Sequence, residues 1–319
     1  MAKPFASSAD LTEKTETLEL LDDGVYALTA EGDPNVGAVE GEDFLVCIEA
    51  RATPATARDW LAMLRQHTEK PVKYLVLTHY HAVRVLGASA FDAETIVTSA
   101  TTRKLIEERG QQDWDSEFGR MPRLFKQPEE IPGLTWPDVT FDDHMTIELG
   151  ADRGHLDLQF CGRGHTAGDI AVWHDKSKTL FAGDLVEAKA ALYTGDAFHM
   201  DWSSATLDRV KAFGAEKLVG GRGAVALGRA DCDAAVEQTR SFLKGMIEHV
   251  GAAHRGGGTL KEAFEATHRA LEPQFGAWPI FEHCLPFNVQ RLWDEFDGID
   301  WPRIWTMERD REVWAQLQD

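Results

Sequence analysis

Two histidines, His79 and His81, stand one residue apart directly after the apolar run LVL at residues 75–77. Side chains alternate in direction along a strand, so residues i and i+2 just beyond its end can point into one pocket. Two imidazoles held in this way can bind a divalent metal ion. The same segment continues with Val83 and Arg84, and neither side chain coordinates such a cation. The segment therefore predicts part of a metal site and leaves open what completes it.

Three later segments place polar side chains near the ends of expected strands. His165 lies on a glycine-flanked turn in GRGHTAGDI, Asp184 follows LFAG, and Arg222 follows LVGG. Functional groups usually gather on the loops that rigid strands position. We therefore expect each of these three residues to lie at the C-terminal end of a strand, where it can take part in a functional site.

The elements that must position these residues are short apolar runs alternating with longer amphipathic runs from about residue 20. Strands are expected at 25–30, 44–50, 73–77, 95–98, 145–149, 156–160, 169–174, 179–182 and 217–221, and helices at 53–67, 101–110 and 203–213. The mixture of adjacent strands and strand-helix-strand units predicts an α/β fold, with sheets covered by helices.

The pattern changes after about residue 230, where apolar residues recur at helical intervals. HRGGGT at 254–259 breaks the chain, and Thr259 can cap a second helix at 261–271. This part predicts a helical extension packed on the core, and packing on a partner subunit in a homo-oligomer stays open. The expected division is an N-terminal arm, an α/β domain and a C-terminal helical extension, at 1–19, 20–230 and 231–319.

Composition narrows the function classes. The chain of 319 residues carries 53 acidic and 33 basic residues, for a formal net charge of -20. This balance disfavours nucleic acid as a partner, because binding a phosphate backbone relies on clustered Lys and Arg. No stretch is apolar enough for a signal peptide or a membrane span, and the four cysteines lack paired spacing. We expect a cytoplasmic protein with reduced thiols and a small-molecule substrate.

Taken together, the four ordered motifs resemble the metallo-β-lactamase-fold hydrolases over roughly residues 20–230. The full pattern of that family is H-x-H-x-D-H, then G-H-[ST], then G-D, then G-H-G. The resemblance implies an αββα sandwich with a metal site along one sheet edge and a C-terminal helical extension beyond it. His79, His81 and His165 match the three histidines of the first metal site.

The second metal site of the family pattern is replaced in this chain. Asp184 matches the residue that bridges the two metals, but Val83, Arg84 and Arg222 stand where an aspartate and two histidines would be. One ligand triad is intact and the other is removed completely, whereas scattered decay would erase both. This division favours a redesigned mononuclear site, with one metal held by the histidines and Asp184 as a further ligand.

Zinc is the expected metal, because three neutral imidazoles and a water form the open tetrahedral arrangement of catalytic zinc. The expected reaction is attack by a zinc-bound hydroxide on an ester, thioester, lactone or amide. Asp184, Arg84 and Arg222 are the expected catalytic side chains around it. The guanidiniums replace the charge of the missing metal and either clamp Asp184 or meet an anionic substrate group or a developing oxyanion.

Two other functions stay open. A non-catalytic or metal-free member of the fold would use Arg84 and Arg222 to neutralise a cavity that binds a ligand or stabilises the fold. The resemblance also allows a mononuclear iron oxygenase, because three histidines and an aspartate suit iron as well as zinc.

Two further segments offer residues for a pocket wall. TGDAFHMDW at 194–202 follows Asp184 and contains His199, Asp201 and Trp202. IFEHCLPFN at 280–288 places His283 beside Cys284, which suits a pocket role, a replacement ligand or plain helix packing.

Overall fold

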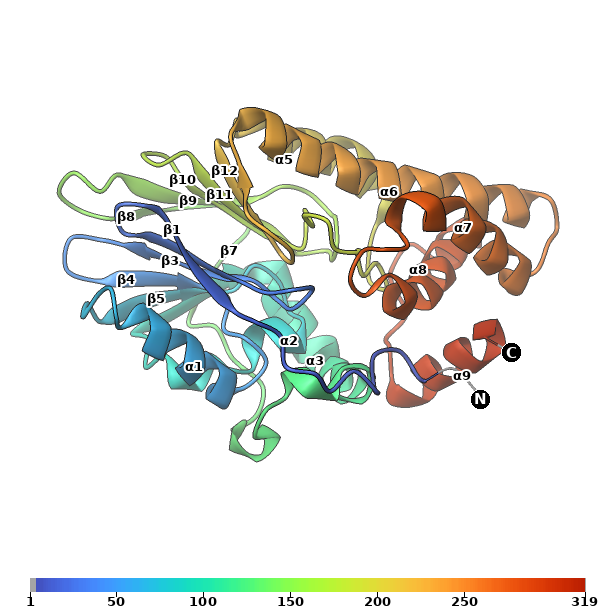
Figure 1. The fold of residues 1–319 in the computed structure, drawn as a ribbon, viewed down its shortest axis with the longest axis horizontal. Coiled ribbons are helices and arrows are strands. Elements are labelled where there is room, and N and C mark those ends of the chain that lie inside the picture. The colour runs from blue at the N-terminus through green and yellow to red at the C-terminus, as the bar shows by residue number, and fades with distance from the viewer. Residues whose placement is uncertain (1–3, 319) are drawn as a thin grey trace.

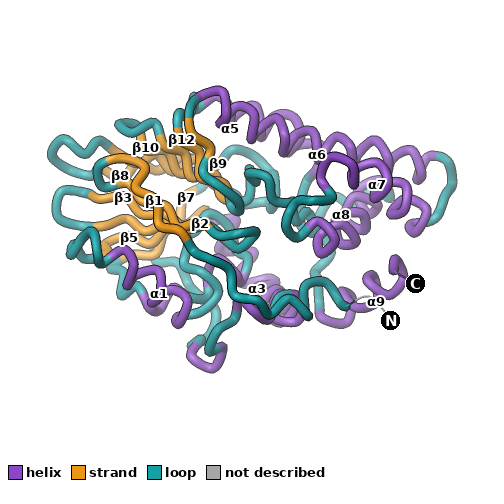
Figure 2. The backbone as a smooth tube through the Cα atoms, in the orientation of Figure 1, coloured by secondary structure: helices purple, strands orange, loops and turns teal. Residues whose placement is uncertain are grey.

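The computed structural model describes residues 4–318, in which two β-sheets lie face to face with helices on their outer sides (Figure 1). The strands and the C-terminal helices occupy opposite ends of the molecule (Figure 2). This arrangement confirms the αββα sandwich and the C-terminal helical extension expected from the sequence.

The first sheet contains β1 to β7 in chain order. The first four strands form an antiparallel meander, and β4 to β7 run parallel to one another. Parallel neighbours need crossover connections, which here contain α1, α2 and α3. These elements are β1 (Thr17–Asp22), β2 (Val25–Thr29), β3 (Val36–Glu40), β4 (Leu45–Ile48), α1 (Pro54–Leu64), β5 (Val72–Val76), α2 (Ala82–Val85), β6 (Thr95–Ser99), α3 (Ala100–Arg120) and β7 (Val139–Phe141).

The second sheet has the order β13-β12-β11-β10-β9-β8, and its β11–β12 pair is parallel. A short helix, a π-helical turn and a further helix lie between β11 and β12, at the segment after Asp184. The elements are β8 (His144–Glu148), β9 (His155–Phe160), β10 (Ile170–His174), β11 (Thr179–Gly183), α4 (His199–Asp201), η4 (Trp202–Thr206), α5 (Leu207–Ala212), β12 (Lys217–Gly220) and β13 (Ala226–Leu227).

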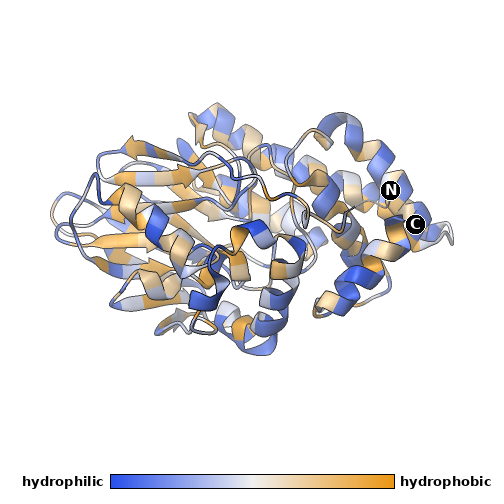
Figure 3. Cartoon of the chain, turned by 60° about the horizontal axis from the view of Figure 1, so that its bottom comes forward, coloured by the Kyte–Doolittle hydropathy of each residue, from blue (hydrophilic) through white to orange (hydrophobic). Residues whose placement is uncertain are grey.

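The sandwich has apolar contacts on both faces of its central strands. Along β4, Val46 and Ile48 pack between the two sheets, whereas Leu45 and Cys47 pack in the cluster that also holds Trp60 of α1. Successive side chains of a strand point to opposite faces. A strand covered on both faces therefore reads as a continuous apolar run, as FLVCI does. Figure 3 shows hydrophobic residues concentrated in the strands, while the helices carry both classes.

The C-terminal region packs as a group of helices beside the sandwich (Figure 1). Its helices are α6 (Arg229–Arg255), α7 (Leu260–Phe275), α8 (Phe281–Phe296) and α9 (Met307–Gln318). Thr259 caps α7 through a reciprocal capping box with Glu262, so the cap expected from the sequence is confirmed. No helix among residues 4–318 is both long and apolar enough to span a membrane.

Two parts of the sheet and helix prediction were incomplete. The strands β1, β3, β7 and β13 were not expected. α3 extends to Arg120, ten residues beyond the expected end. The added half of α3 buries Asp113, Glu117 and Arg120, and charged residues on a buried face give no apolar periodicity to detect.

Candidate metal centre

The first sheet supplies two of the histidines. β5 ends at Val76, and His79 and His81 lie in the loop between this strand and α2. Both are buried, with exposed fractions of 0% and 2%. The loop is fixed by Glu49 at the end of β4, whose carboxylate accepts the backbone N–H of Thr78 at 3.0 Å. The expected strand-end placement of the two histidines is therefore found.

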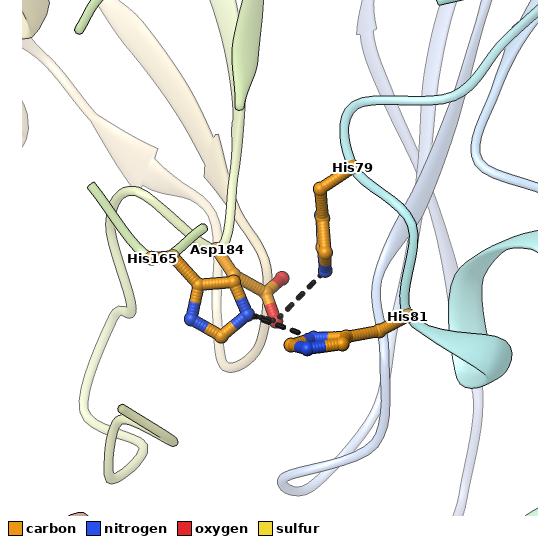
Figure 4. Close-up of side chains that lie close together, drawn as sticks. All are labelled: His79, His81, His165 and Asp184. Atoms are coloured by element: carbon orange, nitrogen blue, oxygen red, sulfur yellow. Dashed lines mark hydrogen bonds and ion pairs between the residues drawn. The ribbon is translucent and has the colours of Figure 1, made fainter. Parts of the chain in front are cut away.

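The second sheet supplies the other two residues. His165 lies in the loop between β9 and β10, and Asp184 directly follows β11. Both are buried, with exposed fractions of 1% and 3%. Figure 4 shows the four side chains converging from the edges of the two sheets. The structure thus brings together the complete expected ligand set.

The candidate ligand atoms lie close to one another. The inner nitrogens of His81 (Nδ1) and His165 (Nε2) are 3.0 Å apart. Asp184 Oδ2 lies 3.5 Å from His165 Nε2 and 3.7 Å from His79 Nε2, and all four ligand atoms fall within 4.8 Å of one another. In a tetrahedral zinc site with bonds of about 2.0–2.1 Å, ligand atoms stand roughly 3.3–3.4 Å apart. The three pair distances are close to this spacing, so the residues fit a zinc-sized cation once the widest pair closes around it.

In each histidine, one ring nitrogen faces the centre of the group and the other, the outer nitrogen, faces away from it. Each outer nitrogen is already hydrogen-bonded. His79 Nδ1 bonds the Thr78 hydroxyl at 2.9 Å, His165 Nδ1 donates to the Tyr193 carbonyl at 2.9 Å, and His81 Nε2 donates to Asp196 at 3.3 Å. The buried Nε2 of His79 has no hydrogen-bond partner among the described residues. Ligand histidines in metalloproteins are held by such outer hydrogen bonds, which fix ring orientation and tautomer.

The three histidines differ in the direction in which their pKa values are shifted. Burial holds the pKa of His79 well below its ordinary value and lowers that of His165 to about 3, so both rings are neutral and able to ligate. Burial also lowers the pKa of His81, but the charges of Asp113 and Asp196 outweigh it and raise the pKa to about 9. His81 is thus the ring whose protonation depends on neighbouring carboxylates.

Arg84 is turned toward Asp184 and is completely buried. Its Nη2 donates to Asp184 Oδ1 and, at 2.7 Å, to the Gly221 carbonyl, and its Nη1 donates to the Asn35 carbonyl at 2.8 Å. A Cβ on Gly221 would lie 2.1 Å from Asp184 Oδ1, so this close approach requires glycine. Both Nη atoms of Arg84 are therefore engaged by protein oxygens.

Arg222 approaches Asp184 from the other side. Its Nη1 lies 3.1 Å from Asp184 Oδ2 and 3.1 Å from Glu187 Oε1. Burial acts to raise the pKa of Asp184, but Arg84, His79 and Arg222 hold it well below its ordinary value. Burial and the charge of Asp184 raise the pKa of Glu187 to about 8. The arginines thus keep Asp184 ionised in a buried position.

Val83, the remaining position of the replaced triad, is 2% exposed. It packs in the apolar cluster that lies against α1.

The segment after Asp184 contributes one wall of the site. The Trp202 ring lies 5.8 Å from the His165 ring, and its indole N–H donates to the Leu185 carbonyl at 3.1 Å. His199 is instead bonded to Thr194 and Glu295, and Asp201 pairs with Arg163 in a more exposed position. Of the three candidates in this segment, Trp202 alone has an aromatic contact with a ligand ring among the contacts the structure records for them.

His283 and Cys284 lie on α8 and are buried. His283 Nδ1 hydrogen-bonds the Ser7 hydroxyl at 2.9 Å. Burial holds the pKa of His283 well below its ordinary value and raises the pKa of the Cys284 thiol, so neither ionises readily there. Within residues 4–318, neither belongs to the metal-ligand group formed by the histidines and Asp184.

Sequence reasoning missed the carboxylates that face His81. Asp196 lies in the same TGDAFHMDW segment from which His199 and Asp201 were selected, and Gly195–Asp196 repeats the Gly-Asp pair of the 183–184 motif. That repeat was the available signal. Asp113 has no comparable signal, because it lies in the polar half of α3.

Known proteins resemble this chain mainly through the sandwich. The profile of the metallo-beta-lactamase superfamily matches residues 30–222. A metallo-beta-lactamase type 2 from Pseudomonas aeruginosa is 22% identical over 211 residues, which are 63% of this chain and 75% of that protein. A hydroxyacylglutathione hydrolase from Methylococcus capsulatus (strain ATCC 33009 / NCIMB 11132 / Bath) is 30% identical over 146 residues, which are 45% of this chain and 53% of that protein.

A further relative and a solved structure have similarly low sequence identity to this chain. The alpha subunit of a 2,4-dinitroanisole O-demethylase from Nocardioides sp. (strain JS1661) is 24% identical over 191 residues, which are 59% of this chain and 50% of that protein. The solved structure of a metallo-beta-lactamase from Pontibacter korlensis has a TM-score of 0.57 at 22% identity. The superposition with this structure covers 72% of this chain and 99% of the Pontibacter korlensis chain, and it supports the assignment of the fold.

Proposed function

This chain belongs to the metallo-β-lactamase superfamily, and we propose that it is a hydrolase that uses one zinc ion to cleave an ester, thioester, lactone or amide of a small molecule. The observation that carries the proposal is the convergence of three imidazole nitrogens whose outer nitrogens are already hydrogen-bonded. A zinc ion in such a site supplies a Lewis acid and lowers the pKa of a bound water to about 7.

The histidine ligands would be held by the chain itself. Thr78, Asp196 and the Tyr193 carbonyl fix the three ring orientations, so little rearrangement is needed to receive an ion. Asp184 lies beside the three rings, and its low pKa keeps its carboxylate anionic, while the hydrolase proposal leaves the fourth coordination position to water. Two relatives with hydrolase activity in their names support hydrolysis as the reaction class.

We assign Arg84 and Arg222 to stabilising Asp184 in place of the second metal. Arg84 donates to protein oxygens through both Nη atoms, and Arg222 does so through Nη1. Side chains engaged in this way have no free donor at these atoms for an anionic substrate group. The Nε of each arginine is buried without a hydrogen-bond partner among the described residues, so their contacts do not decide between an anionic and a neutral substrate.

A second candidate is a non-catalytic member of the fold, and the burial of the site favours it. All four ligand residues are between 0% and 3% exposed. Catalytic zinc sites keep one coordination position open, whereas structural sites are closed by four protein ligands. If Asp184 ligates together with the three histidines, the set is complete without water.

Metal analysis with an activity panel tests both candidates and the choice between zinc and iron. Protein purified without added metal would be measured for zinc and iron per chain, and then assayed with a β-lactam, an acyl-glutathione, a nitrophenyl ester and a lactone. We expect about one zinc and hydrolysis of at least one substrate, with both lost in His165→Ala. One zinc with no turnover of any substrate would favour the non-catalytic candidate, and one iron would favour the oxygenase alternative.

A further inference from the structure

The metal-ligand loop is connected to the part of the chain that lies outside the family match. His81 Nε2 donates to Asp196 Oδ2 at 3.3 Å, and Arg109 Nη1 donates to Asp196 Oδ1 at 3.1 Å. The same Nη1 donates to the Pro302 carbonyl at 3.1 Å. A continuous series of hydrogen bonds thus runs from a metal ligand to the segment between α8 and α9.

We propose that Asp196 and Arg109 are positioning residues that fasten the metal ligand His81 to the C-terminal segment 299–305, so that this segment sets how tightly the metal is held. The proposal rests on the metal site of the proposed function and goes beyond it. Neither residue touches the metal; Asp196 fixes the direction of the His81 ring, and Arg109 fixes Asp196.

The loop that carries Asp196 is itself held by the C-terminal region. Asn288 of α8 accepts the Thr194 backbone N–H at 2.6 Å and donates to the Leu192 carbonyl at 2.8 Å. Arg291 Nε donates to the Ala197 carbonyl at 2.8 Å. These three bonds are made by side chains of one helix to backbone groups on both sides of Asp196. Its position therefore depends on α8.

The segment 299–305 completes this attachment. The Trp305 indole N–H donates to the Gly195 carbonyl at 2.9 Å, directly beside Asp196. The Trp301 ring lies 6.0 Å from the Phe198 ring and 5.7 Å from the Arg109 guanidinium. α9, which follows the segment, contacts α3, the helix that carries Arg109 (Figure 1). The segment is thus held on both the Asp196 side and the Arg109 side.

One other carboxylate faces the same ring nitrogen. Asp113 Oδ1 lies 3.9 Å from His81 Nε2, beyond hydrogen-bond distance, and its Oδ2 accepts the Ala82 N–H at 2.6 Å. Asp196 is closer and is the one that Arg109 holds. Asp113 is therefore the competing assignment that the experiment must separate.

The experiment measures the zinc dissociation constant of the full-length protein by competition with a chromogenic chelator. Asp196→Asn should bind zinc about 10–100-fold more weakly, the usual consequence of removing a hydrogen-bond partner of a ligand histidine. Asp196→Glu keeps the charge and should recover part of the loss. The cobalt-substituted Asp196→Asn protein should show a changed visible absorption spectrum, which a purely structural role would not produce.

The matched control is Asp33→Asn. Asp33 is a similarly buried aspartate between β2 and β3 that pairs with Arg123 at 2.6 Å, with no recorded contact to a ligand histidine or to segment 299–305. Its substitution should leave the zinc dissociation constant unchanged. Trp301→Ala retains every charge and should accelerate zinc loss to the chelator several-fold, which provides a test if Asp196→Asn fails to fold.

Each outcome separates this inference from the proposed function. Unchanged zinc affinity in folded Asp196→Asn, or a loss in Asp113→Asn alone, would overturn the positioning role and leave the hydrolase proposal intact. If Asp196→Asn fails to fold and Trp301→Ala loses zinc at the wild-type rate, the positioning role is likewise overturned. Wild-type protein that binds zinc tightly but hydrolyses nothing would overturn the hydrolase proposal alone. Wild-type protein with no zinc affinity would overturn both.

Discussion

The site has two parts. The histidine half consists of His79, His81 and His165, and the arginine half consists of Arg84, Arg222 and Asp184. Both are buried, yet they are hydrogen-bonded in different ways. In the histidine half, each ring is fixed at its outer nitrogen while the inner nitrogens converge, and His79 Nε2 has no hydrogen-bond partner among the described residues. In the arginine half, the Nη donors of Arg84 and the Nη1 of Arg222 meet protein oxygens.

This difference distinguishes a binding site from a structural one. A buried polar atom without a partner costs free energy unless something occupies it, and His79 Nε2 is such an atom. The Nε atoms of Arg84 and Arg222 are also without a hydrogen-bond partner among the described residues, but their Nη atoms are directed at Asp184 and its neighbours. The nitrogens of the histidine half thus face a common centre, whereas the Nη donors of the arginine half hold an aspartate.

The strongest test of this comparison removes a histidine. His79→Ala, His81→Ala and His165→Ala should each reduce zinc from about one per chain to near zero, because a three-imidazole site loses most of its affinity with one ligand. Elemental analysis of the folded variants measures this. Zinc retained in full by any one of them would remove that residue from the ligand set.

The next test removes a guanidinium. Arg84→Met should destabilise the metal-free protein by about 3–5 kcal/mol, because it leaves Asp184 and two backbone carbonyls without their buried donor. Chemical denaturation compared with Arg84→Lys, which keeps the charge, measures the loss. An unchanged free energy of unfolding, together with lost substrate hydrolysis, would assign Arg84 to the substrate instead.

A glycine next to the ion pair provides a smaller test. Gly221→Ala would place a methyl group 2.1 Å from Asp184 Oδ1 and 2.8 Å from Arg84 Nη2. Neither side chain can withdraw from its buried pair, so we expect a loss of about 1–3 kcal/mol in the free energy of unfolding. If thermal and chemical unfolding both match the wild type, Asp184 and Arg84 can move apart enough to accommodate the methyl group, and their close packing against Gly221 is not required.

The smallest expected effect lies outside the site and sets a scale for the others. Thr259→Ala removes the capping box of α7 and should cost about 1 kcal/mol of stability. Zinc affinity should not change, because Thr259 makes no contact with the histidine half in the hydrogen bonds described for it. A loss of zinc in this variant would mean that the whole C-terminal region, rather than the Asp196 connection, controls the metal.

Most of the sandwich was predictable because its strands are short apolar runs. The missed strand β3 reads VGAVE, where a glycine and an alanine weaken the apolar signal. Gly37 is nevertheless required, because a Cβ there would lie 2.2 Å from the Phe181 ring of the facing sheet. That packing between sheets cannot be read from a local pattern.

The sequence by itself selected the candidate ligands. Its motifs, in the order that resembles the metallo-β-lactamase superfamily, pointed to His79, His81, His165 and Asp184, whose ligand atoms lie within 4.8 Å of one another. Only the tertiary structure decided what surrounds them. Asp196 and Arg109 meet His81 through a loop, α3 and the C-terminal region, and the arginines turn to Asp184 because the two sheets bring them there. Hydrogen bonds between residues distant in the chain leave no periodic signal, whereas ligands placed by a strand do.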